Sequence, residues 1–483
     1  MKFSTTFRLG TFLMSACVFF YFVSCNQDKP STYADTETVG ESYADVATGS
    51  TACECEASWF PHTQTPPPAE GTGSPFDTSS TTNCMFHQWS WQKFLWLTKP
   101  QANGLPLFQN ELYLVDAKMA VVAPQQGEKL VLSSIKQAGG GGILQTNPAF
   151  ASNGSAATVY YSIHVDSTMF SASESFKEAI NGGSLPANNS ETFPIGSLEL
   201  KVAWVDADAI AASEVANYYT TSAAIEVDGA YVTKTVALLG MHVVGVVINH
   251  PEFIWATFEH HSMAPTYNWA TNEASASNDM LLFAAGTTNT LAGIQWDGSA
   301  PKEASKAYTL FELGVPRVSG NGFMATSQKE PENFNNITTI DSCVAANLSD
   351  VWNNYFYKGS LWLNTDGLNP QQQADTIVAM GYGIATVTPN AMPRGCTANA
   401  NLTMETFEQT FAKTIGDISV NNLSNCFSCH SAVGFASGSP KSPLYLSHVF
   451  DGYLQSSQGK TMEQINKLKF EQHSKIRSRL ENQ

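Results

Sequence analysis

Residues 198–204 read Leu198-Glu199-Leu200-Lys201-Val202-Ala203-Trp204, so that apolar side chains at the even positions alternate with polar or small ones. Successive side chains of a β-strand point to opposite faces of a sheet, and a period of two therefore predicts a strand with one buried face. The same alternation recurs over residues 159–165. We expect a strand in both places.

Two more apolar runs extend this pattern towards the C-terminus. The run from Val236 to Ile248 holds five valines and two glycines. Since β-branched residues suit strands and glycine marks bends, it predicts a buried strand with a bend more than a helix. Residues 252–261, after Pro251, are again strand-like. Strands should therefore dominate from about residue 105 to residue 340.

Helical patterns lie on either side of this region. The segment from Cys84 to Leu97 is apolar nearly all round and is followed by Pro100, which predicts a helix buried in the core. Further helical patterns occur over residues 371–380, 403–415 and 461–480.

The N-terminus predicts export. Lys2 and Arg8 precede an apolar stretch over residues 9–23, and we expect a signal peptide over residues 1–24. Its end resembles a bacterial lipobox, which implies that Cys25 is acylated. The protein would then be a lipoprotein tethered to a membrane of the bacterial cell envelope, on the periplasmic or outer-membrane face. The alternative is ordinary cleavage near Ser24.

Composition sets further bounds. The formal net charge is −17, so nucleic acid is not an expected partner. Residues 25–82 are rich in Ser, Thr, Asp, Gly and Pro without a lasting hydrophobic period, which predicts a flexible tether. After the signal peptide no apolar run reaches the roughly 18 residues that a membrane span requires.

Near the C-terminus stands Cys426-Phe427-Ser428-Cys429-His430. Two thiols three positions apart lie on one side of a helical turn, where both can add to the vinyl groups of a haem, and the adjacent imidazole then faces the iron. We expect one covalent haem c on Cys426 and Cys429, with His430 as the proximal iron ligand. A redox dithiol or half of a zinc site is the alternative, but no second Cys-x-x-Cys exists.

The sixth iron ligand is open. Met462 follows the motif on a charged helical segment, Met404 precedes it, and His448 stands 18 residues after His430. Each is a possible distal ligand, and each is equally compatible with a core Met or a hydrogen-bonded His. A Met ligand would favour a higher reduction potential than a second His.

Strand parity groups several titratable residues. It places His242 with the valines at 244 and 246 on one face, and His260 on an apolar face opposite to Glu259. A buried His beside a carboxylate can be a ligand, a proton donor or a core residue. A peroxidase-type enzyme with an open iron site and a distal His260–Glu259 acid/base pair is therefore the alternative to an electron-transfer protein. A surface binding lipoprotein with structural haem is a third possibility.

Five cysteines remain for disulfides, namely Cys53, Cys55, Cys84, Cys343 and Cys396. In an oxidising compartment we expect Cys343 to pair with Cys396, and Cys84 to pair with Cys53 or Cys55.

Several stretches together carry a family resemblance. They are Leu198–Trp204, Leu239-Gly240-Met241-His242, Trp255–His260, Thr403–Thr406, the Trp91–Pro100 segment and the haem motif. The chain resembles a family of large bacterial mono-haem c-type cytochromes in which a β-rich body precedes a short Cys-x-x-Cys-His tail. The doubled His260-His261 and the stretch Trp96–Lys99 depart from the family pattern.

The resemblance implies an α+β fold. A β-rich main domain of sandwich-like antiparallel sheets would cover residues 83–400, and a small α-helical cytochrome c-like haem segment residues 401–483. The resemblance supplies no established reaction. The haem motif itself favours an electron-transfer protein over a catalyst, and no catalytic residue is assigned. The partner would be a redox protein, steered by the basic residues of the tail from Lys460 to Gln483; the alternative is a charged terminal helix that is simply solvated.

Overall fold

The computed structural model describes a large part of the chain after residue 52. The described residues are 53–63, 70–78, 83–134, 144–151, 153–182, 191–227, 229–266, 268, 271, 273–289, 310, 330–363, 367–380, 393–395, 401–404, 426–430, 432 and 441–457.

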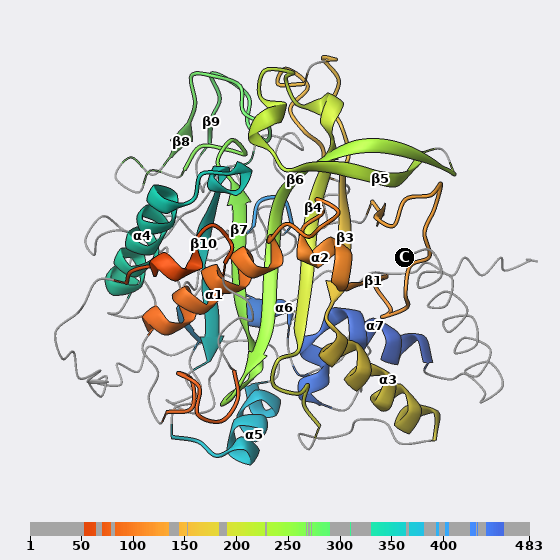
Figure 1. Ribbon diagram of the computed structural model, residues 1–483, viewed down its shortest axis with the longest axis vertical. Helices are drawn as coiled ribbons and strands as arrows, with labels where there is room; N and C mark the ends of the chain where they lie inside the picture. Colours follow the sequence, from red (N-terminus) through yellow and green to blue (C-terminus); the bar gives the residue numbers. More distant parts are fainter. Residues whose placement is uncertain are drawn as a thin grey trace, which may run out of the picture.

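A curled sheet of nine strands forms the centre of the molecule (Figure 1). Its strands are β1 (Tyr113–Val115), β2 (Val131–Leu132), β3 (Val159–Val165), β4 (Leu198–Asp206), β5 (Thr220–Val227), β6 (Ala230–Val247), β7 (His250–His260), β10 (Tyr355–Leu363) and β11 (Pro393–Gly395). The main path runs β1-β3-β4-β6-β7-β10-β11, and β5 joins the outer part of β6 and pairs with β2. All pairs are antiparallel except β2 with β5. A separate two-stranded ribbon consists of β8 (Ala274–Ser275) and β9 (Thr288–Asn289).

Helices and short 3-10 turns surround the sheet. The helices are α1 (Asn83–Leu97), α2 (Leu107–Glu111), α3 (Ser167–Asn181), α4 (Glu330–Asn347), α5 (Pro370–Met380), α6 (Cys426–Cys429) and α7 (His448–Ser457). The 3-10 turns are η1 (Ala57–Trp59), η2 (Ala207–Ala209), η3 (Val215–Asn217), η5 (Val351–Asn354) and η8 (Pro443–Leu446). None of the helices in these described ranges combines the length and the apolar character that a bilayer span needs.

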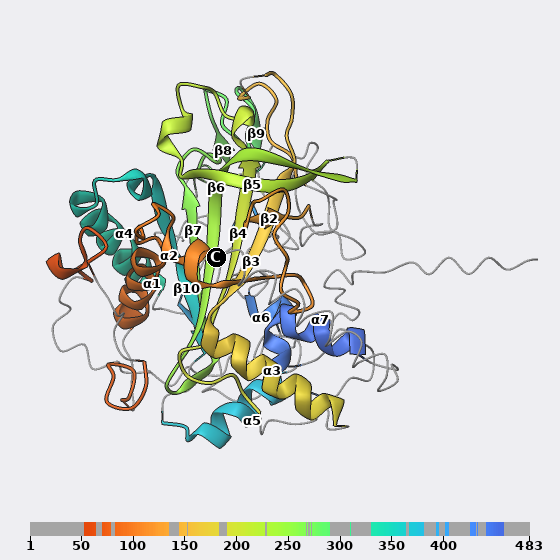
Figure 2. The same ribbon diagram turned by 45° about the vertical axis from the view of Figure 1, so that its right-hand side comes forward.

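The β-rich α+β class is confirmed, and so are the strands expected over 159–165, 198–204, 236–248 and 252–261. The helix expected from Cys84 to Leu97 is present as α1, and the pattern over 371–380 is α5. Two corrections concern the β-rich region. Three helices, α2, α3 and α4, interrupt it, and in the described part of the chain helices, not a second large sheet, cover the faces of the main sheet (Figure 2).

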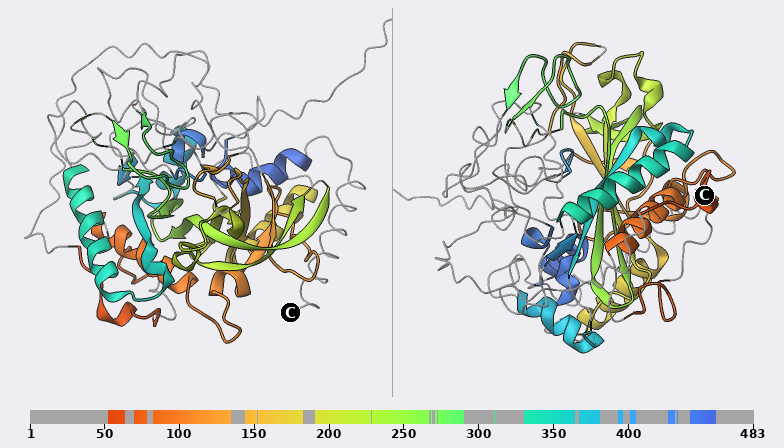
Figure 3. Two further views of the ribbon diagram at one scale, coloured as in Figure 1. Left: turned by 90° about the horizontal axis from the view of Figure 1, so that it is seen from above. Right: turned by 90° about the vertical axis from the view of Figure 1, so that its left-hand side faces the viewer.

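The two faces of the main sheet differ in what covers them. We call the side packed against α1 and α4 the aromatic face, to which β4 contributes Leu198, Leu200, Val202 and Trp204. The opposite side, where α3, α6 and α7 lie, is the α6 face (Figure 2). Glu199 and Lys201 belong to the α6 face because neighbouring residues of a strand point to opposite sides. Figure 3 shows the two layers from above and from the side.

Ring packing dominates the aromatic face. Phe94 of α1 stacks on Phe258 of β7 with ring centroids 4.2 Å apart, and Trp91 meets the same ring edge-on at 5.1 Å. Phe94 and Phe258 have no exposed surface. A helix that is apolar on all sides fits this position, because α4 covers the side of α1 that the sheet leaves open.

Two disulfides tie the N-terminal segment to this face. Cys53 bonds to Cys84 at the start of α1, and Cys55 bonds to Cys343 of α4. The Cys53–Cys84 bond is one of the two pairings expected for Cys84. The expected pairing of Cys343 with Cys396 is wrong, because the segment around Cys55 packs beside α4 and Cys343 is bonded to Cys55. Cys396 lies outside the described residues.

The expected tether also needs correction. Residues 53–63 and 70–78 fall inside it, yet both segments are packed on the body. Trp59 and Phe76 are buried, and Glu70 forms an ion pair of 2.9 Å with Lys93 of α1. The folded body therefore includes residues 53–63 and 70–78, ahead of residue 83.

Candidate haem site

The Cys-x-x-Cys-His motif forms the helical turn expected for it. Residues Cys426–Cys429 are α6, and the backbone N–H of His430 donates to the carbonyl oxygen of Cys426 at 2.7 Å. Cys426 and Phe427 are buried in an apolar cluster on the α6 face, together with Val244, Trp255 and residues of η8 and α7. The motif is thus seated on the sheet.

His430 is held in one orientation. Its Nδ1 donates to the carbonyl oxygen of Leu446 at 2.8 Å. Burial, followed by the charges of His448, His242 and Lys201, lowers the pKa of His430 well below its usual range. The ring is therefore neutral with its proton on Nδ1, which leaves the lone pair on Nε2. Histidines that bind metals commonly have this arrangement, since a carbonyl fixes the tautomer and the ring plane.

Trp255 supports His430 from the sheet. The two rings lie 4.2 Å apart between centroids. The indole Nε1–H donates to the backbone carbonyl of Glu252 at 2.9 Å. The Glu252 carboxylate in turn accepts hydrogen bonds from His250 Nδ1 at 2.8 Å and from the backbone N–H of Leu363 at 3.0 Å. Hydrogen bonds near the start of β7 thus fix the indole that packs against His430.

Polar side chains of β4 and β6 lie beside this ring. Lys201 and His242 are direct partners in the pairing of the two strands, and His242 Nδ1 is 2.9 Å from Thr257 Oγ1. Glu199 accepts a hydrogen bond from Ser447 Oγ at 2.7 Å. Burial raises the pKa of Glu199 to about 7, against the opposing effects of Ser447 and Lys201. The α6 face therefore holds an acid, a base and an imidazole next to the motif.

The expected distal ligands lie in different places. His448 stacks face to face on His430, with centroids 3.6 Å apart and 15° between the planes. Two rings stacked at this distance leave no room for a metal ion between them. His448 thus lies beside His430. Met404 is buried in a second cluster of the α6 face with Leu402 and Met263, and Met462 lies outside the described residues. The sixth ligand stays a prediction.

The segment that carries Met404 is well fixed. Asn401 Nδ2 donates to the carbonyl of Phe258 at 3.2 Å, and Tyr161 Oη donates to the carbonyl of Thr403 at 2.6 Å. The segment packs over Gly240, where a Cβ would come within 3.0 Å of the side chains of Asn401 and Thr403. The absence of a side chain at residue 240 thus lets the segment approach the sheet.

The acid/base pair considered for a peroxidase is not a pair in the structure. His260 stacks on Tyr218 at 3.7 Å and contacts Tyr355 on the aromatic side, and burial lowers its pKa to about 4. Glu259 points to the α6 face, where it forms an ion pair of 3.4 Å with Lys358. The two side chains therefore serve opposite faces of the sheet.

The donor set fits a covalent haem. In the described ranges no three His, Cys, Asp or Glu side chains gather as a metal site of their own. A haem needs no such group, because the porphyrin supplies four nitrogens and the protein only the axial ligands. The turn α6 and a neutral His430 with an available Nε2 provide the remaining chemistry.

Sequence reasoning missed three groups around His430. Strand register and the path of η8 place these groups next to the motif, and they are Trp255, Leu446 and Ser447. Trp255 shares strand parity with Thr257, which pairs with His242, but the register between β6 and β7 was needed to see it. In comparisons with models of known families, with curated proteins and with solved structures, the chain has no match.

Proposed function

We propose that this protein is a lipid-anchored mono-haem c-type cytochrome of the bacterial cell envelope that transfers electrons to or from another redox protein. The observation that carries the proposal is His430, half-buried at the end of α6 and held by Leu446 as a neutral imidazole with Nε2 available. The haem, when bound, supplies one-electron exchange at its iron.

The chain's own residues have distinct roles in this proposal. Cys426 and Cys429 hold the macrocycle covalently, and His430 is the proximal iron ligand. Lys201 and His242 lie on the adjoining strands and offer a cation and a hydrogen-bond donor to the carboxylates of the porphyrin. Trp255 excludes water from the His430 side and keeps the imidazole plane fixed.

Attachment and partner follow from the ends of the chain. Cys25 would hold the protein on the periplasmic or outer-membrane face, and the basic tail over residues 460–483 would steer an acidic redox partner. Both lie outside the described residues. Their positions in the sequence support the proposal, since haem attachment through this motif takes place outside the bacterial cytoplasm.

The experiment is expression of the full chain in a bacterial host competent in cytochrome maturation. After denaturing electrophoresis the protein should retain a haem-stained band, and its intact mass should include one porphyrin. Cys426→Ser and Cys429→Ser together should abolish both signals, whereas the control Ser428→Ala, inside the same motif, should keep them. Wild-type protein that is exported and soluble but carries no haem would overturn the proposal.

Optical spectra separate electron transfer from catalysis. A low-spin ferric protein that is reversibly reduced supports the cytochrome. A high-spin protein that binds cyanide rapidly and turns over peroxide would instead support the enzyme, although the placement of His260 and Glu259 on opposite faces removes the acid/base pair that this alternative needs. Haem that cannot be reduced reversibly would indicate a structural role.

A further inference from the structure

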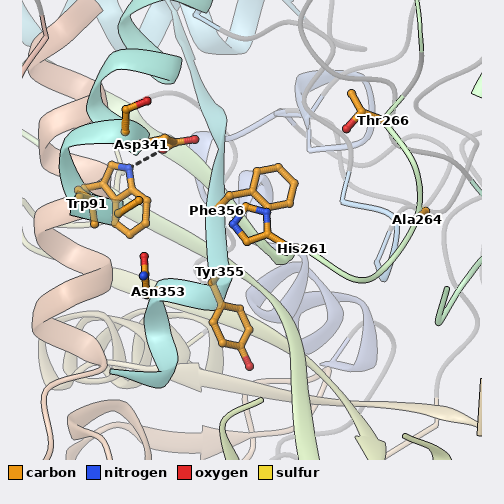
Figure 4. Close-up of a pocket in the computed structure, with 11 residues that line it drawn as sticks. Trp91, His261, Ala264, Thr266, Asp341, Asn353, Tyr355 and Phe356 are labelled. Carbon is orange, nitrogen blue, oxygen red and sulfur yellow. Dashed lines mark hydrogen bonds between the residues drawn. The ribbon is translucent and has the colours of Figure 1, made fainter. Parts of the chain in front are cut away.

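A cavity of about 360 Å³ lies between α1, α4, the start of β10 and the segment that follows β7 (Figure 4). Its walls include Trp91, His261, Asp341, Ser342, Asn353 and Phe356. This volume is at the small end of the range of roughly 300–1,000 Å³ found for ligand sites. None of these residues belongs to the candidate haem site.

Asp341 is the charged group in this cavity. One carboxylate oxygen accepts a hydrogen bond from Trp91 Nε1 at 2.9 Å (Figure 4), and the backbone N–H of Tyr357 donates a second. Both donors are neutral, and no ion pair among the described residues includes Asp341. Burial raises the pKa of this carboxyl well above its usual range. Asp341 is partly exposed and lines the cavity, where a cationic ligand would favour the charged form of the carboxyl.

His261 lines the cavity at an exposed position. Its ring stacks on Phe356 with centroids 5.0 Å apart and 19° between the planes. The pKa of His261 is lowered by burial, so the imidazole is neutral at pH 7 and does not repel a cation in the cavity. Trp91 and Phe356 line the same space and provide aromatic surface.

The lining selects one chemical class of ligand. A carboxylate accepts hydrogen bonds from an ammonium group, and aromatic rings attract cations through their faces. The net charge of −17 raises the local concentration of cations at the surface. We propose that this cavity binds a small protonated primary amine with an aromatic or apolar body, whose ammonium group pairs with Asp341.

The test is isothermal titration calorimetry on the full chain with 2-phenylethylamine as the probe. Its neutral analogue 2-phenylethanol has the same shape without the charge and should bind at least tenfold more weakly. Asp341→Asn keeps an acceptor for Trp91 but removes the charge, and should lower the affinity for the amine at least tenfold. Asp375→Asn, the same change at an exposed position of α5, should leave the affinity unchanged.

A second variant keeps the proposal falsifiable if Asp341→Asn fails to fold. Ala345→Trp adds bulk at an exposed position of α4 that lines the cavity, and should abolish binding without disturbing the core. Equal binding of amine and alcohol, unchanged affinity in Asp341→Asn, or no binding of the amine to the wild-type chain would each overturn the proposal.

Discussion

The two faces of the main sheet are made by the same strands, yet they bury different chemistry. On the aromatic face β4 presents Leu198, Leu200, Val202 and Trp204, and α1 and α4 complete an apolar layer. On the α6 face the same strand presents Glu199 and Lys201 beside His430. Glu199, Lys201 and His242 gather around His430 on the α6 face, which indicates a site there, whereas the ring packing of the aromatic face supplies stability.

Truncation on the aromatic face should have the largest effect on stability. Phe94→Ala removes a ring without exposed surface that stacks on Phe258, and should lower the free energy of unfolding by about 3–5 kcal/mol. Denaturant unfolding followed by tryptophan fluorescence measures it. Val232→Ala, at a position 37% exposed on β6, should change it by less than about 0.5 kcal/mol. A loss below about 1 kcal/mol for Phe94→Ala would contradict the stability role of this face.

The disulfides give a second test of the aromatic face. Replacing Cys55 and Cys343 by Ser should destabilise the protein by about 2–4 kcal/mol. The Cys53–Cys84 bond spans 31 positions and the Cys55–Cys343 bond 288. Chain entropy therefore predicts a cost roughly 2 kcal/mol larger for loss of the longer link. Equal midpoints for the two double variants in urea would show that chain entropy does not govern these links.

On the α6 face the expected effect depends on pH. The pKa of Glu199 is about 7 in the folded chain, above its reference value of 4.5. The folded state therefore holds this proton more tightly than the unfolded state, and the stabilisation present below pH 4.5 is lost as the pH rises to about 7.

Glu199→Gln should remove this dependence. Relative to wild type, the variant should gain stability between pH 4.5 and pH 8 by no more than about 3 kcal/mol. Urea unfolding at a series of pH values measures the difference. Glu178→Gln, at an exposed position of α3, serves as the control and should follow the wild-type profile. A parallel profile for Glu199→Gln would show that the carboxyl is not buried in the native protein.

The smallest effect concerns the reduction potential, and it depends on the proposed haem. Lys201→Gln removes a positive charge next to His430 and should lower the midpoint potential, because a nearby cation favours the reduced state. Lys234→Gln makes the same change where the lysine pairs with Asp206 on the outer part of β6, and should shift the potential less. Redox titration followed by visible spectra measures both. Equal shifts would indicate a general charge effect only.

Much of the sheet was predictable, since local alternation carries it. β3, β4, β6 and β7 follow from apolar periodicity, and α1 follows from its continuous apolar surface. α3 and α4 were missed because their sequences are rich in Ser, Asn and Thr, which are weak helix formers. Tertiary packing outweighs propensity in α4, where Ile337, Ile340 and Val344 recur at helical spacing and are buried against the core.

The candidate site was predictable only in part. The motif itself identifies Cys426, Cys429 and His430, because the chemistry requires those residues in that order. The ring of Trp255 and the carbonyl of Leu446 reach His430 through long-range packing that no local pattern records. The same limit explains the wrong partner for Cys343, since its true partner, Cys55, is 288 positions away.

The pair of disulfides has one more consequence, for limited proteolysis. Because Cys55 is bonded to Cys343, a single backbone cleavage anywhere between residues 84 and 343 yields two fragments that remain one covalent molecule. A cut between residues 55 and 84 is bridged in the same way by Cys53 and Cys84. A chain nicked between residues 55 and 343 would thus migrate as a full-length species until a reductant is added, and the part after the nick would stay attached.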